Sequence, residues 1–342
     1  MTGTVLVARP DSAGDVLLAG PAIRAVAAGA REVVLLAGPL GRAAAELLPG
    51  VDRVIEWEAP WIAADPPPMT GEHAARLVRA VRAAAPDLAL IFTSFHQSPL
   101  PLALLLRLAG TPRIAAISGD YPGSLLDLRH TVDEDVDVPE AERMLALARA
   151  AGFELPAGDD GALAVRRPLP EVEHLTGPPG YVVVHPGASV PARAWPAAEC
   201  ARAVTALAAA GHRVVVTGGR GERGLTEVVT GVDALDLGGR TSFAELASVL
   251  AAASAVVVPN TGPAHLAAAV GTPVVSLFAP VVPAGRWAPY RVPVVLLGDQ
   301  AAPCRGSRAR LCPVPGHPCL SSVTPDQVVE AVRDLVAVKE RV

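Results

Sequence analysis

Lysine is almost absent from this sequence. Lys339 is the only lysine among 342 residues, so nearly every positive charge is carried by arginine. The formal net charge is −5, and no run of arginines follows a predicted helix or strand face. This pattern excludes the basic surface that nucleic-acid-binding proteins use. Any cationic role in a functional site must therefore fall to arginine.

The sequence also lacks a leader pattern and an uninterrupted apolar span. Residues 1–8 have no basic n-region and run directly into a strand pattern, so we expect a cytoplasmic protein. The longest stretch without Asp, Glu, Lys or Arg covers residues 246–285. Prolines and glycines between Pro259 and Pro273 divide it into pieces too short to cross a bilayer. We expect it to be buried core.

A second apolar run, residues 99–108, has two interpretations. Its length suits a core helix, and this is the favoured one. The alternative is a face that touches a membrane surface, so membrane contact is expected to be peripheral at most.

Four cysteines are too few for a disulfide scaffold in a chain of this length. Cys200 is expected in a helix core. The other three form a C-x7-C-x4-H-x-C cluster with a histidine, made of Cys304, Cys312, His317 and Cys319. These spacings are looser than the pairs of structural zinc sites. Thiols that pack a loop are therefore the favoured interpretation, a bound metal is the alternative, and no metal is assigned to the functional site.

Strand and helix patterns alternate along the whole chain. Short apolar strands such as residues 5–8, 33–37 and 88–93 are separated by amphipathic helices, and the same alternation restarts at residue 181. This predicts an α/β fold with two open parallel sheets, each covered on both faces. Ligands of such sheets bind at the carboxyl ends of the strands, so we expect an active site in a cleft between the domains.

Proline and glycine cluster between Pro168 and Gly180, which places the domain linker there. We expect an N-terminal Rossmann-like domain over residues 1–170. A C-terminal Rossmann-like domain is expected over residues 171–324. A terminal helix region follows over residues 325–342, and one arrangement packs it back on the N-terminal domain.

Three loops of the second half each follow a strand and lead into a helix. They are residues 185–189, 218–222 and 260–265. Helix N-termini favour anions, and glycine lets a phosphate approach the backbone. Three such loops on one sheet edge indicate a diphosphate site rather than ordinary turns. Neither G-x-G-x-x-G after a first strand nor a G-x-x-x-x-G-K-[ST] loop is present, which disfavours the dinucleotide and P-loop classes.

Asp15 lies at the end of the first strand pattern, on the edge expected to face the cleft. It could be a first-turn acid that complements the helix dipole. A carboxylate in this place could equally accept a proton from an acceptor hydroxyl. The pattern alone leaves both open.

Several segments resemble the glycosyltransferase family of ADP-heptose:lipopolysaccharide heptosyltransferases, glycosyltransferase family 9. They occur in the family's order along nearly the whole chain, and residues 57–175 match least. The resembling segments are VLVARPDSAGDVLLAGPAI (5–23), HPGASVPARAWP (185–196), VVTGGRGE (215–222), LGGRTSF (237–243) and VVVPNTGPAHLAAAVGTPVVSLFAP (256–280). The resemblance implies a GT-B fold, in which two Rossmann-like domains face each other across an interdomain cleft. It also implies that the domain of residues 1–170 binds the acceptor and that the domain of residues 171–324 binds the nucleotide sugar.

The resemblance also assigns roles by position. Asp15 matches the catalytic aspartate of the family's Gly-Asp motif. Ser12, just before it in the loop, is assigned to donor binding. Arg193 falls where the family has a lysine on the donor's diphosphate. Glu222 falls where an acid meets the ribose, and Thr241 where the chain passes the adenine.

The last donor-binding segment matches the family's Asp-[Ser/Thr]-Gly-x-x-His pattern around the phosphates. It consists here of Asn260, Thr261, Gly262 and His265. Asn260 replaces the family's aspartate, which removes a negative charge beside a diphosphate. The loop of residues 279–283 also lacks the glycine and polar residues of the family's Gly-Pro-Thr-Asp-Pro turn.

The implied activity is inverting, metal-independent transfer of a sugar, a heptose, from an ADP-activated donor. No cofactor is required, and the acceptor is a hydroxyl of a glycan, a glycolipid or a small molecule. Two alternatives remain open at this point. One is a sugar-nucleotide epimerase on the same scaffold, and the other is a catalytically silent nucleotide-sugar-binding protein.

Overall fold

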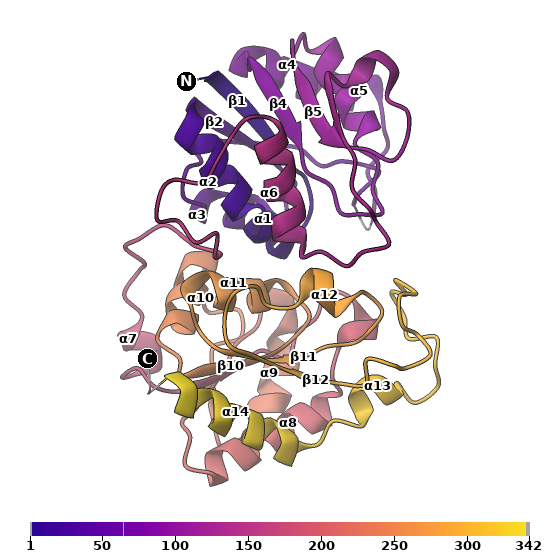
Figure 1. The fold of residues 1–342 in the computed structure, drawn as a ribbon. Helices are drawn as coiled ribbons and strands as arrows, with labels where there is room; N and C mark the ends of the chain where they lie inside the picture. Colours follow the sequence, from indigo (N-terminus) through magenta and orange to yellow (C-terminus); the bar gives the residue numbers. More distant parts are fainter. Residues whose placement is uncertain (1, 64, 340–342) are drawn as a thin grey trace. The chain divides into compact units, whose positions relative to one another are not determined.

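A computed structural model describes residues 2–63 and 65–339, with the side chains of 338 and 339 left out. Residues 340–342, part of the expected terminal helix region, lie outside this range. The chain divides into two compact units, Met1–Arg166 and Arg167–Val342 (Figure 1).

The first unit is built on a six-stranded parallel sheet in the order β3-β2-β1-β4-β5-β6. Its strands are β1 (Thr2–Arg9), β2 (Ala30–Ala37), β3 (Arg53–Glu56), β4 (Leu88–Ile91), β5 (Ile114–Ile117) and β6 (Leu128–His130). Its helices are α1 (Ala13–Leu18), α2 (Gly20–Gly29), α3 (Arg42–Leu47), α4 (Gly71–Ala84), α5 (Leu100–Leu108), η1 (Gly123–Leu125) and α6 (Glu140–Ala150). The strand order reverses between β1 and β4, which is where ligands of open α/β sheets bind.

The second unit repeats this topology in the order β12-β11-β10-β7-β8-β9. Its strands are β7 (Val182–Val184), β8 (Val214–Val216), β9 (Leu235–Asp236), β10 (Ala255–Pro259), β11 (Val274–Leu277) and β12 (Val294–Leu297). Its helices are α7 (Glu173–Thr176), η2 (Pro191–Arg193), α8 (Ala197–Ala209), η3 (Arg220–Glu222), α9 (Arg223–Thr230), α10 (Phe243–Ala251), α11 (Gly262–Val270), α12 (Ala284–Trp287), α13 (Pro318–Ser321) and α14 (Pro325–Lys339). The switch point here lies between β7 and β10. The predicted α/β class with two Rossmann-like parallel sheets is confirmed.

Alternating strand residues bury both faces of the first sheet. Leu6 and Ala8 of β1 share a core with Leu77 of α4 and Leu102 of α5. The intervening Val5 and Val7 are also fully buried, because strand side chains alternate between faces. In Figure 1, α1, α2 and α6 lie across the sheet from α4 and α5.

The terminal helix α14 lies on the second unit. It packs against α8 and against β10, β11 and β12. Val328, Val332 and Leu335 supply its buried side chains. This apolar face anchors α14 to its own sheet.

The Ala- and Leu-rich residues 15–28 predict one helix after β1, but the structure has two. α1 ends at Leu18 and α2 begins at Gly20. Pro21 has no N–H group to donate, and its ring excludes the carbonyl of the preceding turn, so a continuous helix cannot form. The break leaves α1 as a short element that carries Asp15 in its first turn.

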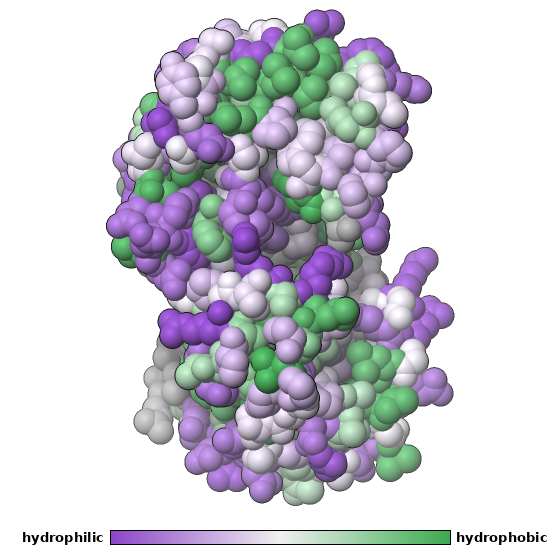
Figure 2. All heavy atoms as spheres, turned by 90° about the vertical axis from the view of Figure 1, so that its right-hand side faces the viewer, coloured by the Kyte–Doolittle hydropathy of each residue, from purple (hydrophilic) through white to green (hydrophobic). Residues whose placement is uncertain are grey.

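The apolar run of residues 99–108 forms α5, which buries Leu102, Ala103, Leu105 and Leu106. Leu104 and Leu108, one helical turn apart, are 49% and 57% exposed. Figure 2 shows apolar atoms gathered on the first unit, on the side where α5 lies in Figure 1. Within residues 2–63 and 65–339, none of the helices combines the length and the apolar character that crossing a bilayer requires.

Candidate active site

Arg9 lies at the centre of the candidate site in the first unit. It is the last residue of β1, and its side chain is fully buried. Its Nη2 atom donates to Asp15 Oδ1 at 3.0 Å and to Ser94 Oγ at 2.9 Å. Its Nη1 atom lies 3.4 Å from Asp11 Oδ2. Arg9 thus joins the loop after β1 to the loop after β4, at the switch point of the sheet.

The candidate base Asp15 is held from two sides. Ser12 Oγ donates to Asp15 Oδ2 at 2.8 Å, while Arg9 binds the other oxygen. The Asp15 side chain is 21% exposed, so the carboxylate is both positioned and reachable from solvent. Ser12 and Asp15, which the sequence placed in one loop, are therefore brought into direct contact.

Further charged groups surround Arg9 below this surface. Gln97 Nε2 donates to Asp11 Oδ1 at 2.6 Å, and Glu140 of α6 is fully buried nearby. Burial by itself lowers the pKa of Arg9, but the carboxylates of Asp11, Asp15 and Glu140 outweigh it and raise the pKa above its usual value. Burial raises the pKa of Asp11, and Arg9 offsets part of that shift. Arg9 therefore stays a cation throughout the range in which an enzyme works.

Sequence reasoning missed Arg9, Asp11 and Glu140. A lone arginine at the end of an apolar strand was the available signal. Its burial depends on Ser94 and Glu140, which lie far away along the chain.

In the second unit, the predicted donor-binding residues follow four adjoining strands, β10, β7, β8 and β9. Parallel strands end at the same edge, so the structure gathers these residues on one side of the sheet. They are Arg193 after β7, Glu222 after β8, Thr241 after β9, and Asn260, Thr261, Gly262 and His265 after β10. Ser12 and Asp15 belong to the first unit.

Glu222 occupies a space that glycine leaves free. Its Oε2 atom accepts a hydrogen bond from the backbone N–H of Gly219 at 2.6 Å. A Cβ atom built on Gly187 would overlap the Glu222 carboxylate. Gly187 thus lets the loop after β7 and the carboxylate after β8 lie against each other.

His185 supports this arrangement and was not among the predicted site residues. Its Nδ1 atom shares a 3.0 Å hydrogen bond with Thr217 Oγ1, and its Nε2 atom lies 3.9 Å from Glu222 Oε2. Burial lowers the pKa of His185, and Glu222 raises it only in part. At neutral pH His185 is therefore a buried, uncharged group at this edge of the sheet. Its place in the loop after β7 was visible in the sequence, but its pairing with Thr217 was not.

The segment after β10 turns directly into α11. Thr261 is the N-cap residue, and Gly262 and Pro263 open the helix. Asn260 and His265 are each 3% exposed. Among the described residues, no hydrogen-bond partner satisfies Asn260 Nδ2. The N-terminus of α11 and this buried amide can both donate hydrogen bonds to an anion.

The four cysteines are free thiols. Cys304 and Cys319 are buried in the core of the second unit, and Cys312 packs against it. Burial, together with the neighbouring thiols of Cys304 and Cys312, raises the pKa of Cys319 to about 12. Over the part of the chain that the structure describes, no three His, Cys, Asp or Glu side chains are grouped to hold a metal ion.

The Arg9 cluster predicts a large stability effect. Arg9→Met should lower the free energy of unfolding by about 3–5 kcal/mol, because it leaves buried carboxylates without their cation. Denaturant unfolding followed by circular dichroism would measure this. The control is Arg42→Met, which removes exposed ion pairs with Glu46 and Glu56 and should cost under about 1 kcal/mol. Equal losses in the two variants would contradict the structural role of Arg9.

The family model of glycosyltransferase family 9 (heptosyltransferase) matches residues 74–316, more than two thirds of the chain. Lipopolysaccharide heptosyltransferase 3 of Escherichia coli is 33% identical over 114 residues. That segment covers 32% of this chain and 34% of the relative, so the chain matches about a third of the relative's length.

Two solved structures share the fold. E. coli ADP-heptose lps heptosyltransferase II matches over 98% of this chain and 99% of its own, with a TM-score of 0.76 and 20% identity. E. coli heptosyltransferase WaaC with ADP-2-deoxy-2-fluoro heptose matches over 97% and 99%, with a TM-score of 0.69 and 20% identity. The family predicted from the motifs is thus confirmed: this chain belongs to glycosyltransferase family 9, the heptosyltransferases.

Proposed function

We propose that this protein is an inverting, metal-independent glycosyltransferase. It moves a sugar, a heptose, from an ADP-activated donor to a hydroxyl of a glycan, a glycolipid or a small molecule. Family membership supports the reaction class, and the ADP-sugar bound by WaaC supports the donor. The observation that carries the mechanism is the Asp15 carboxylate held between Arg9 and Ser12 at the carboxyl end of β1.

In this reaction the Asp15 carboxylate accepts the proton of the acceptor hydroxyl. The acceptor oxygen then forms a bond to the anomeric carbon, on the face opposite the diphosphate. The bond from that carbon to the phosphate oxygen breaks, and its electron pair leaves with ADP. The anomeric configuration is therefore inverted.

The second unit supplies the groups suited to the donor. Arg193 and the backbone N–H groups near Thr261 and Gly262 stabilise the charge that grows on the leaving diphosphate. Asn260 and His265 line the same segment, Glu222 receives the ribose hydroxyls, and Thr241 lies beside the adenine. These assignments rest on motif position and on the shared sheet edge.

Asp15→Asn tests the proposed base. It should lower kcat by on the order of 10² to 10⁴ while donor affinity changes little, because general-base catalysis acts in the transition state. The assay is ADP release from ADP-heptose with and without an oligosaccharide acceptor. Acceptor-dependent release marks transfer rather than epimerisation or silent binding.

Exposed Asp135→Asn is the matched control and should keep the wild-type rate. If Asp15 only complements the helix dipole, Asp15→Asn costs roughly 0.3–1 kcal/mol of stability and leaves turnover intact. A folded Asp15→Asn enzyme with near wild-type kcat would refute the assignment.

Gly187→Ala tests whether Glu222 belongs to the donor site. The added methyl group must displace the Glu222 carboxylate. The donor dissociation constant should therefore rise roughly tenfold or more through the lost charge-assisted hydrogen bonds. Titration calorimetry with ADP measures this. Gly221→Ala is the control in the neighbouring loop, since a Cβ atom there meets nothing within 4 Å. Unchanged ADP affinity in Gly187→Ala would remove Glu222 from the donor site.

The proposed leaving-group stabilisation uses arginine and backbone N–H groups in place of a divalent ion. Activity should therefore persist in excess EDTA, measured as acceptor-dependent ADP release. Loss of activity that Mg²⁺ or Mn²⁺ restores would overturn this part of the mechanism. Loss that only zinc or iron restores would direct attention to Cys304, Cys312 and Cys319.

A further inference from the structure

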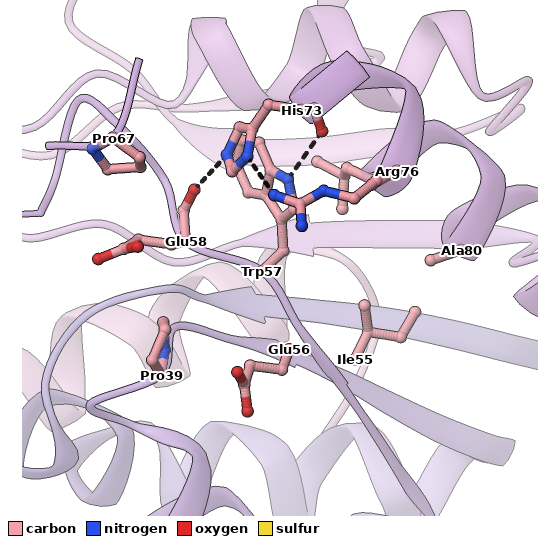
Figure 3. Close-up of a pocket in the computed structure, with 10 residues that line it drawn as sticks. Pro39, Ile55, Glu56, Trp57, Glu58, Pro67, His73, Arg76 and Ala80 are labelled. Carbon is pink, nitrogen blue, oxygen red and sulfur yellow. Dashed lines mark hydrogen bonds between the residues drawn. The ribbon is translucent and has the colours of Figure 1, made fainter. Parts of the chain in front are cut away.

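The first unit contains a pocket that the proposed mechanism leaves unused. It has a volume of about 270 Å³ and lies between the ends of β2 and β3 and the first turns of α4 (Figure 3). Ile55, Trp57 and Leu77 give it an apolar floor. Glu58 and Arg76 add polar groups at its edge. Small-molecule sites commonly combine an apolar lining with a few placed polar groups in this way.

Hydrogen bonds hold one wall of the pocket rigid. Arg76 Nη2 lies 2.7 Å from His73 Nδ1, and His73 Nε2 lies 2.8 Å from the Glu58 carbonyl oxygen. A guanidinium can only donate, so Nδ1 accepts and His73 is the neutral tautomer that donates from Nε2. Trp57 Nε1 donates to the His73 carbonyl at 3.1 Å, and the two rings lie 4.7 Å apart. Figure 3 shows the Arg76 guanidinium held beside His73. A guanidinium carries more N–H groups than this one hydrogen bond uses.

The charges around the pocket are unfavourable for an anion. The Glu56 carboxylate forms an ion pair with Arg42, with Oε2 lying 3.3 Å from Arg42 Nη1. Within the described residues, the Glu58 carboxylate has neither an ion pair nor a hydrogen bond. The stretch of residues 54–75 carries four carboxylates and no Arg or Lys, which leaves Arg76 as a single cation at its end. Like charges close together repel, so a phosphate or carboxylate group would be disfavoured here.

The pocket adjoins the loop that carries Asp15. Its wall includes Pro39, in the turn after β2. A Cβ atom on Gly38 would overlap Pro10, and one on Gly41 would overlap Asp11, so this turn packs directly on the loop after β1. β3 and β1 are separated by β2 alone, which puts their ends roughly 10 Å apart. This separation is on the scale of two linked sugar units.

We propose that this pocket binds an uncharged sugar ring of the acceptor, and this inference rests on the proposed function. The apolar floor packs against the C–H face of the ring. The Glu58 carboxylate accepts hydrogen bonds from two hydroxyl groups, and the Arg76 guanidinium donates to ring or hydroxyl oxygens. The acceptor unit beside the reacting hydroxyl is therefore a neutral glycosyl residue rather than an acidic or phosphorylated one.

The test measures binding to the full chain without donor. The probes are the methyl glycosides of glucose, galactose and mannose, with methyl glucuronide as the charged counterpart, followed by saturation-transfer and titration NMR. At least one neutral glycoside should bind, and the glucuronide should bind at least several-fold more weakly. Glu58→Gln and Arg76→Gln should each weaken the neutral glycoside about tenfold. The controls Glu72→Gln and Arg79→Gln, exposed on the same helix α4, should stay within about twofold.

Three results would overturn the proposal. They are no binding of any neutral glycoside, a preference for the glucuronide, and binding that Glu58→Gln and Arg76→Gln leave unchanged. Using two pocket variants keeps the test decisive if one of them fails to fold. If one of these results is found but ADP release still depends on an acceptor, the pocket proposal is wrong and the proposed function is retained. If a glycoside binds but no sugar is transferred, the pocket proposal is retained and the proposed function is wrong.

Discussion

The buried Arg9 guanidinium is the interaction on which the first unit depends. A desolvated cation is costly unless carboxylates surround it. Asp11 of the loop after β1, Asp15 of α1 and Glu140 of α6 meet that requirement. Because Arg9 ends β1 and also binds Ser94 after β4, the same contact joins the strands on either side of the switch point. Stability and positioning are thus coupled, since the group that neutralises Arg9 at the surface is the proposed base.

In the second unit, glycines rather than a buried charge position the carboxylate of the candidate site. Gly187 and Gly219 let the Glu222 carboxylate lie against two loops at once, one by leaving space and one by donating its backbone N–H. His185 lies below, uncharged and fixed by Thr217. In the proposed donor site, helix N-termini and Arg193 would face the phosphates, and the Glu222 carboxylate would face the ribose hydroxyls.

Within the first unit, these features also separate two tasks along one sheet edge. The end of β1 holds a carboxylate beside a cation, which suits proton transfer. The ends of β2 and β3 hold an apolar floor and one free carboxylate, which suits recognition of hydroxyl groups. The turn after β2, with Gly38 and Gly41, keeps the two regions in contact. A side chain at either glycine would therefore press on the loop that carries Asp15.

The sequence by itself determined the two parallel sheets, the family, and the strand-end loops that hold Asp15, Glu222 and Asn260, because alternation and strand direction are local properties. It did not specify β5, β6, α6 or β12, whose short or polar segments carry weak periodicity, and it missed the break before Pro21. Only the tertiary structure decided that Arg9 is buried against Ser94, that His185 pairs with Thr217, and that Trp57, His73 and Arg76 enclose a pocket. Burial and hydrogen bonding depend on neighbours brought together by the sheet, and for Arg9 and Ser94 that neighbour lies 85 positions away.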